Sequence, residues 1–158
     1  MTLTPANPHL HLTVAAIIEK DGRFLMVEEI DNAKPVYNQP AGHVEPEESL
    51  LVAVIRETLE ETAWHFQPEA LIGIYRWQLP GSEEIYLRHC FSGQARQQDT
   101  TRPLDSGIVR TLWLSLADLR QQRQRLRSPL VLACLEDYVA GQRYPLSLYR
   151  DLGQAPTL

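Results

Sequence analysis

The sequence contains few of the features that mark secreted or membrane proteins. Its two cysteines, Cys90 and Cys134, are too few for a disulfide framework and form no spaced metal motif. Both lie among apolar neighbours, so we expect buried thiols in a reducing cytoplasm. No uninterrupted apolar run approaches the ~18 residues of a membrane span, and residues 1–12 lack the basic and apolar regions of a signal peptide. These absences predict a cytoplasmic protein without a membrane partner.

The chain also lacks an excess of basic residues and several common catalytic motifs. Its 15 lysines and arginines against 20 aspartates and glutamates leave a net charge of −5, which argues against nucleic acid as a partner. A small anionic substrate remains compatible if a metal ion supplies positive charge locally. There is no G-x-S-x-G, P-loop or G-x-G-x-x-G pattern, which argues against covalent serine catalysis and dinucleotide folds. With 158 residues, we expect a single domain over 1–158, as a monomer or small homo-oligomer.

Hydrophobic periodicity predicts a mixed sheet flanked by helices. Alternating or β-branched segments predict extended structure over 10–19, 24–29, 36–39, 70–80, 84–95 and 109–114. Helical spacing and capping signals predict helices over 47–62, 116–122 and 130–140. Turn-forming residues predict loops over 31–35 and 99–107 and an irregular tail over 144–158. Because strands flank the first helix and helices follow the last strand, we expect an α/β fold with the sheet between helical layers.

The helix over 47–62 carries an unusual charge pattern at its C-terminal end. Its apolar spacing predicts one buried stripe, formed by Leu51, Val54, Ile55 and Thr58. Glu57, Glu60 and Glu61 fall at i, i+3 and i+4, so they share a face that we place roughly opposite the stripe. Their mutual repulsion and the helix dipole both disfavour this arrangement. Two interpretations stay open: a solvated acidic face, or carboxylates whose repulsion a divalent cation such as Mg²⁺ or Mn²⁺ removes.

The stretch 42–64 resembles the Nudix box, a loop–helix signature of the Nudix hydrolase family. The fixed polar and glycine positions of that signature are occupied by Gly42, Glu48, Arg56, Glu57, Glu60 and Glu61, and Trp64 takes the final apolar one. Two positions depart from it: Thr58 replaces an aliphatic residue, and Ala63 replaces the closing glycine. Neither is a ligand position, but Ala63 makes the usual left-handed helix exit harder, because alanine resists that backbone conformation.

The resemblance implies the Nudix α/β/α sandwich over nearly the whole chain and Mg²⁺-dependent hydrolysis of nucleoside diphosphate derivatives. Three sequence segments are similar to those of bacterial NudJ-type phosphatases: YNQPAGH before the helix, LRSPLV over 126–131 and GQRYPL over 141–146. Similarity to that subgroup implies that the protein releases orthophosphate from nucleoside di- and triphosphates and from the pyrimidine pyrophosphate of thiamine synthesis. The alternatives are a pyrophosphohydrolase of dinucleoside polyphosphates or nucleotide sugars, and a non-catalytic module that senses a nucleotide.

The resemblance also implies a metal site. Glu57 and Glu61 would be the main ligands of Mg²⁺, for which Mn²⁺ could substitute. Glu60 would be a further ligand or the base that activates water, and the main-chain carbonyl of Ala41 would complete the set.

Two further roles concern the surroundings of that site. Glu48 would pair with Arg56 and stabilise the loop–helix, while Arg56 orients a neighbouring glutamate. Many family members carry a catalytic acid in the loop before the strand that ends in tryptophan, but Gly107 occupies the expected position here. Asp105 lies two residues earlier and could reach the site; its alternative is a simple turn residue. If Asp105 is idle, Glu60 must serve as the base.

Candidates for substrate binding come from arginines and aromatic residues outside the box. Arg88 lies in a predicted strand whose alternation could direct it into a cleft. Arg127 and Arg143 could hold a terminal phosphate, although each could equally be a surface charge or a helix cap. Tyr37 and Trp77 could stack on a nucleobase or simply belong to the core.

Overall fold

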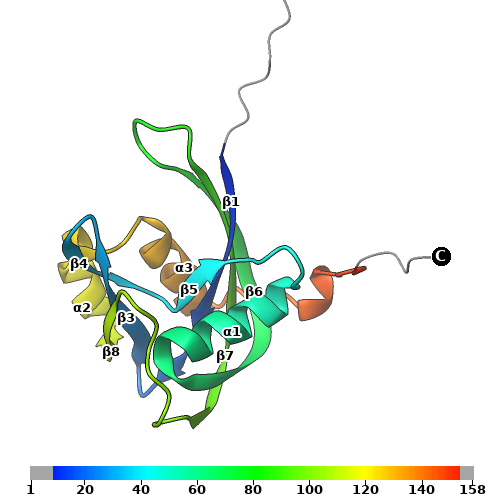
Figure 1. The fold of residues 1–158 in the computed structure, drawn as a ribbon, viewed down its shortest axis with the longest axis horizontal. Coiled ribbons are helices and arrows are strands. Elements are labelled where there is room, and N and C mark those ends of the chain that lie inside the picture. Colours follow the sequence, from blue (N-terminus) through cyan, green and yellow to red (C-terminus); the bar gives the residue numbers. More distant parts are fainter. Residues whose placement is uncertain (1–8, 154–158) are drawn as a thin grey trace, which may run out of the picture.

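The computed structural model describes residues 9–153 and contains two four-stranded sheets (Figure 1). The first has the order β5-β1-β7-β6, formed by Ala41–His43, Leu10–Ile17, Ile85–Gln98 and Trp64–Gln78. It is mixed, because β1 runs parallel to β7 and antiparallel to β5. The second is antiparallel, with β3 (Arg23–Asp31) paired to β2 (Glu19–Lys20), β4 (Lys34–Asn38) and β8 (Ile108–Ser115).

Helices cover both faces of the sheets (Figure 1). α1 (Leu50–Thr62) packs on one face, and α2 (Leu116–Gln121) and α3 (Leu130–Val139) pack on the other. Successive side chains of β1 point to opposite faces of the sheet, so this strand contributes to the hydrophobic clusters on both sides. Val14 and Ala16 belong to the hydrophobic cluster under α1, whereas Ala15 and Ile17 belong to the cluster under α2 and α3. The expected mixed sheet between helical layers is confirmed.

The predicted loop over 31–35 is wrong. β3 continues to Asp31 and β4 begins at Lys34, so only a two-residue turn separates them. Both turn residues, Asn32 and Ala33, have positive φ, of 48° and 63°. This is the backbone of a tight hairpin turn whose twist matches that of the flanking strands. Pairing of β3 with β4 imposes that conformation on Ala33, although alanine does not favour it.

α1 begins later than the sequence pattern predicts, and its buried face is different. Ser49 is the N-cap and its side chain accepts a hydrogen bond from the Val52 amide, so the segment with Pro46 precedes the helix. The buried positions are Leu50, Ala53, Val54, Thr58, Glu61 and Thr62. Ile55 is exposed. The acidic face therefore borders the buried one instead of lying opposite it.

The C-cap of α1 is Ala63, which has the left-handed conformation with φ 60° and ψ 13°. The Ala63 amide donates to the Leu59 carbonyl at 2.8 Å, and the side chain is buried. The helix exit typical of glycine is thus kept by an alanine. Packing outweighs a local cost of about 1–2 kcal/mol for a non-glycine residue in this region.

β6 and β7 form a long hairpin whose far end extends away from the body of the molecule (Figure 1). The predicted strands over 70–80 and 84–95 are confirmed in kind, but β6 begins six residues early, at Trp64. Register shifts near Pro68 and Leu71 let the strand continue past the proline. The predicted helices after β8 are confirmed within two residues, and Ser115 caps α2 with Asp118 in a capping box.

The tail is less irregular than expected. Tyr144 exchanges two backbone hydrogen bonds with Leu71, at 2.9 and 2.8 Å, and a 3₁₀ turn follows at Leu146–Leu148. Leu146 and Tyr149 pack against the cluster under α1. The rest of the predicted tail, 154–158, lies outside the described residues.

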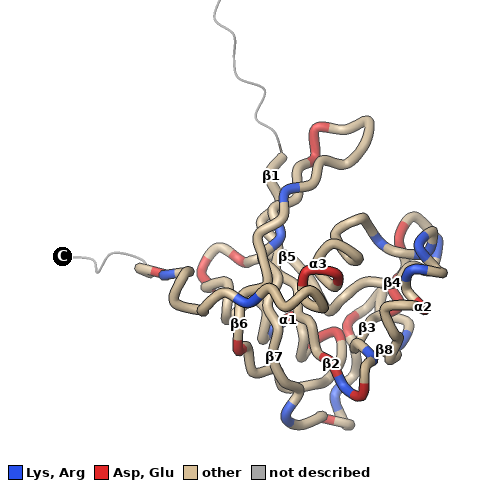
Figure 2. The backbone as a smooth tube through the Cα atoms, turned by 180° about the vertical axis from the view of Figure 1, so that it is seen from behind, with Lys and Arg blue, Asp and Glu red and all other residues tan. Residues whose placement is uncertain are grey.

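Charges of both signs are interspersed along the backbone as Figure 2 shows it. Cys90 and Cys134 are free and buried, as predicted. None of the helices in residues 9–153 combines the length and the apolar character that crossing a bilayer requires.

Candidate functional site

The box glycine lies against one of the box carboxylates. Gly42 is the middle residue of β5, and a β-carbon built on it would lie 2.1 Å from Cδ of Glu57 and 2.2 Å from its Oε1. A side chain at position 42 would have to displace the Glu57 carboxylate. Glycine therefore lets the α1 carboxylate lie against the β5 backbone.

Arg56 connects the loop to the end of the helix. Its Nε donates to Glu48 at 2.9 Å, and its Nη1 donates to Glu57 at 2.9 Å and to Glu60 at 3.1 Å. Nη2 also donates to Glu48 and to the His43 carbonyl. The paired bonds between Arg56 and Glu48 are a forked interaction that fixes orientation as well as distance. Arg56 also lowers the pKa of the Glu48 carboxyl.

Glu61 is the most deeply buried of the three box carboxylates. Only 7% of the residue is exposed, and its Oε2 accepts a hydrogen bond from the Ala41 amide at 2.9 Å. Burial raises the pKa of Glu61 to about 9, with further upward contributions from Glu29 and Glu57. Burial also raises the pKa of Glu57, although Arg56 opposes that shift. Arg56 thus pairs with Glu57 and Glu60, whereas Glu61 has no ion-pair partner among the described residues.

The chemistry of these side chains fits a hard divalent cation. Carboxylate oxygens are the donors that Mg²⁺ and Mn²⁺ prefer, and a bound cation would offset the burial and repulsion just described. Within residues 9–153, no three His, Cys, Asp or Glu side chains already surround a common point as a metal cage does. Arg56 holds Glu57 and Glu60, and Glu61 is held by Ala41. Metal ligation by Glu57, Glu60, Glu61 and Ala41 stays a prediction.

Asp105 belongs to a loop that docks on the C-terminal part of α1. Its amide donates to the Glu60 carbonyl at 3.0 Å. The residue is exposed, and its charge adds to the raised pKa values of Glu57 and Glu61. Gly107, at the position expected for an acid, has φ 95° and closes the turn before β8.

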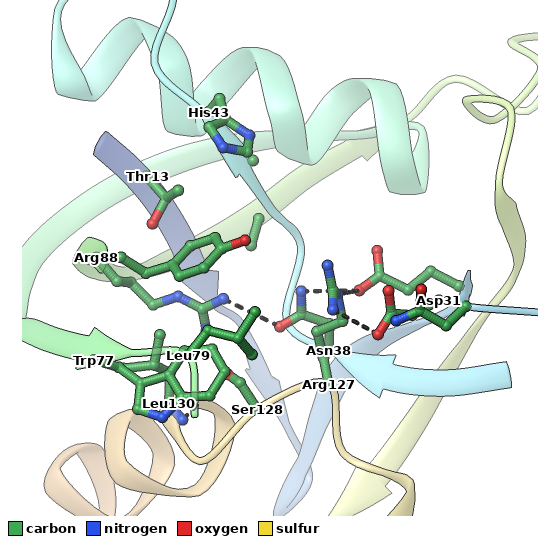
Figure 3. A pocket seen from close by; sticks show the side chains of 15 residues that line it. Thr13, Asp31, Asn38, His43, Trp77, Leu79, Arg88, Arg127, Ser128 and Leu130 are labelled. Carbon is green, nitrogen blue, oxygen red and sulfur yellow. Dashed lines mark hydrogen bonds and ion pairs between the residues drawn. The ribbon is translucent and has the colours of Figure 1, made fainter. Parts of the chain in front are cut away.

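A cavity of about 420 Å³ opens beside the box and extends over the face of the first sheet that α3 partly covers (Figure 3). Three of the predicted substrate-binding residues line it: Arg88, Trp77 and Arg127. The Arg88 guanidinium is buried, with Nη1 donating to Gln39 at 3.0 Å. Arg127 is held by Asp31 at 2.7 Å and by Glu29 at 3.3 Å. Arg88 forms no such ion pair among the described residues.

The other two candidates do not line this cavity. Tyr37 is buried with 3% exposure, and the Arg125 guanidinium lies 4.3 Å from its ring centroid. Arg143 lies near the end of α3, where its guanidinium is 3.8 Å from the Tyr138 ring and donates to the Tyr138 carbonyl. The position of Tyr37 agrees with the alternative interpretation of core packing, and that of Arg143 agrees with a helix-end cap.

Sequence reasoning did not single out two residues that line the cavity. Glu29, at the end of β3, accepts from Asn38 at 3.2 Å, and burial raises its pKa. Its only sequence signal is a pair of adjacent glutamates after an apolar strand. Thr13, on β1, has a buried hydroxyl without a hydrogen-bond partner in the described chain. Nothing in its local sequence distinguishes it from an ordinary strand threonine.

Comparison with known proteins supports the resemblance. The NUDIX domain family model matches residues 9–133. The chain is 41% identical over 141 residues to Phosphatase NudJ of Escherichia coli O1:K1, covering 89% of this chain and 91% of that protein. A solved NUDIX hydrolase from Nitrosomonas europaea is 47% identical with a TM-score of 0.89, covering 92% of this chain and 99% of that one. A MutT NUDIX hydrolase from Burkholderia pseudomallei shares the fold, at 21% identity and a TM-score of 0.69, over 82% and 98% of the two chains.

Proposed function

The chain belongs to the Nudix family and is a Nudix hydrolase, and we propose that it removes the terminal phosphate of nucleoside di- and triphosphates with Mg²⁺ as cofactor. The observation that carries this proposal is the complete set of box carboxylates, held by Arg56 and by the β5 backbone beside a cavity with a buried arginine. Similarity to Phosphatase NudJ supports the choice of phosphate as product.

In this proposal, Glu57, Glu61 and the Ala41 carbonyl hold the metal, with Glu60 as a further ligand. Bound Mg²⁺ would polarise the phosphoryl oxygen and lower the pKa of the attacking water. Arg56 keeps the Glu57 carboxylate at the β5 backbone, and Glu48 fixes Arg56 in turn. Mn²⁺ would substitute, because it accepts the same oxygen donors.

We assign the general base to Asp105, which accepts the proton of the attacking water. Arg56 engages the Glu60 carboxylate, whereas Asp105 is exposed on a loop fixed to the end of α1. A carboxylate that is free to reach the water suits this role better than one already paired. Glu60 is the alternative base.

The cavity provides the place for the rest of the substrate. Trp77 presents an aromatic surface there, and Arg88 supplies positive charge, whereas Arg127 is paired with Asp31 and Glu29. Such a site suits a small nucleotide, and the pyrimidine pyrophosphate of thiamine synthesis is a second candidate. Pyrophosphate release from dinucleoside polyphosphates or nucleotide sugars is the alternative reaction. We propose that the enzyme acts in the cytoplasm, where nucleotides occur and its two thiols stay reduced.

The test is product analysis on a small panel with Mg²⁺ and with a chelator. The panel contains GTP, GDP, a dinucleoside tetraphosphate and hydroxymethylpyrimidine pyrophosphate. Metal-dependent orthophosphate from GTP and GDP is the expected result. Pyrophosphate, or cleavage of the dinucleotide alone, would contradict the proposed substrate. Binding of nucleotide without any turnover would favour a sensor module, against which the three intact box glutamates argue.

A further inference from the structure

Two polar side chains on the floor of the cavity have unused hydrogen-bonding capacity. Thr13 on β1 is paired in register with Arg88 on β7, and both residues are only 6% exposed. Arg88 donates from Nη1 to Gln39 at 3.0 Å and from Nη2 to Asn38 at 3.4 Å. Its Nε and the Thr13 hydroxyl have no partner in the described chain. Both atoms are closed to solvent, but Nη1 and Nη2 of Arg88 each carry a second N–H, and both residues line the cavity, so Arg88 keeps donors for a ligand there.

The surroundings of Arg88 indicate the kind of ligand. Figure 3 shows Trp77, Leu79 and Leu130 gathered at the same end of the cavity as Arg88. The Tyr86 ring lines the cavity too and lies 5.7 Å from the Trp77 ring, centroid to centroid. A phosphate group would lose hydration against such apolar walls. A planar heterocycle would instead place its faces on them and its polar edge toward Arg88.

The position of Arg88 separates it from the reacting group. β1 lies between β5 and β7, and His43, Thr13 and Arg88 occupy matching positions on these three strands. Two strand spacings put the Arg88 backbone roughly 9–10 Å from β5, against which Glu57 lies. The Arg88 guanidinium reaches part of the way back, to Asn38 and Gln39. This arrangement suits a substrate whose phosphoryl group lies at the carboxylates and whose distal part lies at Arg88.

We propose that Arg88 and Thr13 form a base-reading subsite that selects nucleobases with two adjacent hydrogen-bond acceptors. Guanine presents such a pair at O6 and N7, and cytosine presents one at O2 and N3. Arginine donates to such a pair with two parallel N–H bonds. Adenine places an amino donor beside N7, and uracil places a ring N–H between its carbonyls, so neither offers the pair. This inference rests on the proposed function for the identity of the substrate as a nucleotide.

The experiment measures binding of GMP, CMP, AMP and UMP by calorimetry. These monophosphates are products of the proposed reaction and are not turned over. We expect the wild type to bind GMP and CMP roughly tenfold tighter than AMP and UMP. Arg88→Gln should abolish that preference, and Arg88→Lys should too, because lysine lacks the planar fork. Thr13→Val, which removes only an unbonded hydroxyl, should weaken GMP and CMP binding and preserve the fold.

Arg96→Gln is the matched control. Arg96 lies on β7 as Arg88 does, but it is exposed and donates to Gln67 at 2.7 Å. It should keep the wild-type preference, and circular dichroism would establish that all variants are folded. Equal affinity of the wild type for all four nucleotides would overturn the proposal. So would an equal loss for all four in a folded Arg88→Gln protein, which would indicate a phosphate contact instead. A preserved preference without any hydrolysis would reject the proposed function and leave the subsite standing.

Discussion

The Glu57 carboxylate lies where a side chain of residue 42 would otherwise begin, 2.1 Å from the position of a β-carbon on Gly42. The two residues are fifteen positions apart and belong to a strand and a helix. Their contact couples the position of a helix carboxylate to the absence of a side chain on the strand. It also means that a single added methyl group can displace a proposed metal ligand without changing any charge.

Gly42→Ala should therefore reduce turnover strongly and stability little. The clashing atoms belong to the flexible end of the Glu57 side chain, which can move aside at a cost of about 1 kcal/mol. A displacement of about 1 Å at a reactive site can lower the rate roughly a hundredfold. Steady-state kinetics and thermal denaturation would check both parts. Full activity in this variant would show that Glu57 need not lie against β5.

Glu61→Gln should leave the fold intact and lower turnover by about two or more orders of magnitude. The glutamine oxygen can still accept from the Ala41 amide, and the neutral amide resembles the protonated form that a pKa of about 9 gives Glu61 at neutral pH without metal. The neutral amide is a poor Mg²⁺ ligand compared with a carboxylate. Turnover measured across a Mg²⁺ titration would show the loss. Near-normal turnover in the folded variant would contradict the assignment of Glu61 as a ligand.

Removal of the metal should stop turnover and lower stability together. A ligand that binds only the folded state adds about 2.7 kcal/mol when present at 100 times its dissociation constant. We expect a chelator to abolish phosphate release and to lower the melting temperature. In Glu61→Gln the chelator should shift the melting temperature much less. An equal shift in both proteins would indicate a metal bound elsewhere.

Glu48→Gln should destabilise the fold by about 1–2 kcal/mol at neutral pH, because it replaces a charge-assisted fork with weaker bonds. The pKa of Glu48 is lowered in the folded protein from its ordinary 4.5, chiefly by Arg56. Its contribution is thus complete above pH 4.5 and is lost as the pH falls through the lower folded value. Denaturant unfolding from pH 7 to 3 should show the two proteins converging in acid. A constant difference over that range would contradict the ion pair as the cause.

Asp105→Asn should lower the maximal rate by about two orders of magnitude with little change in metal affinity, if Asp105 is the base. Glu60→Gln should instead weaken metal binding and loosen Arg56. Rates and Mn²⁺ affinities of the two variants, compared with Asp99→Asn as a loop control, would separate these roles. The opposite pattern would move the base to Glu60.

The box was predictable because its geometry is local. Residues 57, 60 and 61 share a helical face whenever the segment is helical, so spacing alone brought the three glutamates together. The start of α1 was not predictable to the residue: the pattern predicts a helix from 47, whereas the helix begins at Leu50 after the Ser49 N-cap. The turn at Asn32 and Ala33 was missed since strand pairing, not residue preference, imposes its positive φ values.

The sequence by itself determined the layered α/β fold and placed Glu57, Glu60 and Glu61 on one helical face, because hydrophobic periodicity and helical spacing are properties of neighbouring residues. Only the tertiary structure decided that Glu61 is buried and that Glu57 lies against Gly42. It also decided that Arg88, among the predicted substrate-binding residues, lines the cavity without an ion pair in the described chain. Burial and pairing depend on segments that are distant in the chain. Thr13 and Arg88 are 75 positions apart, and nothing in either local sequence says that two strands place them side by side.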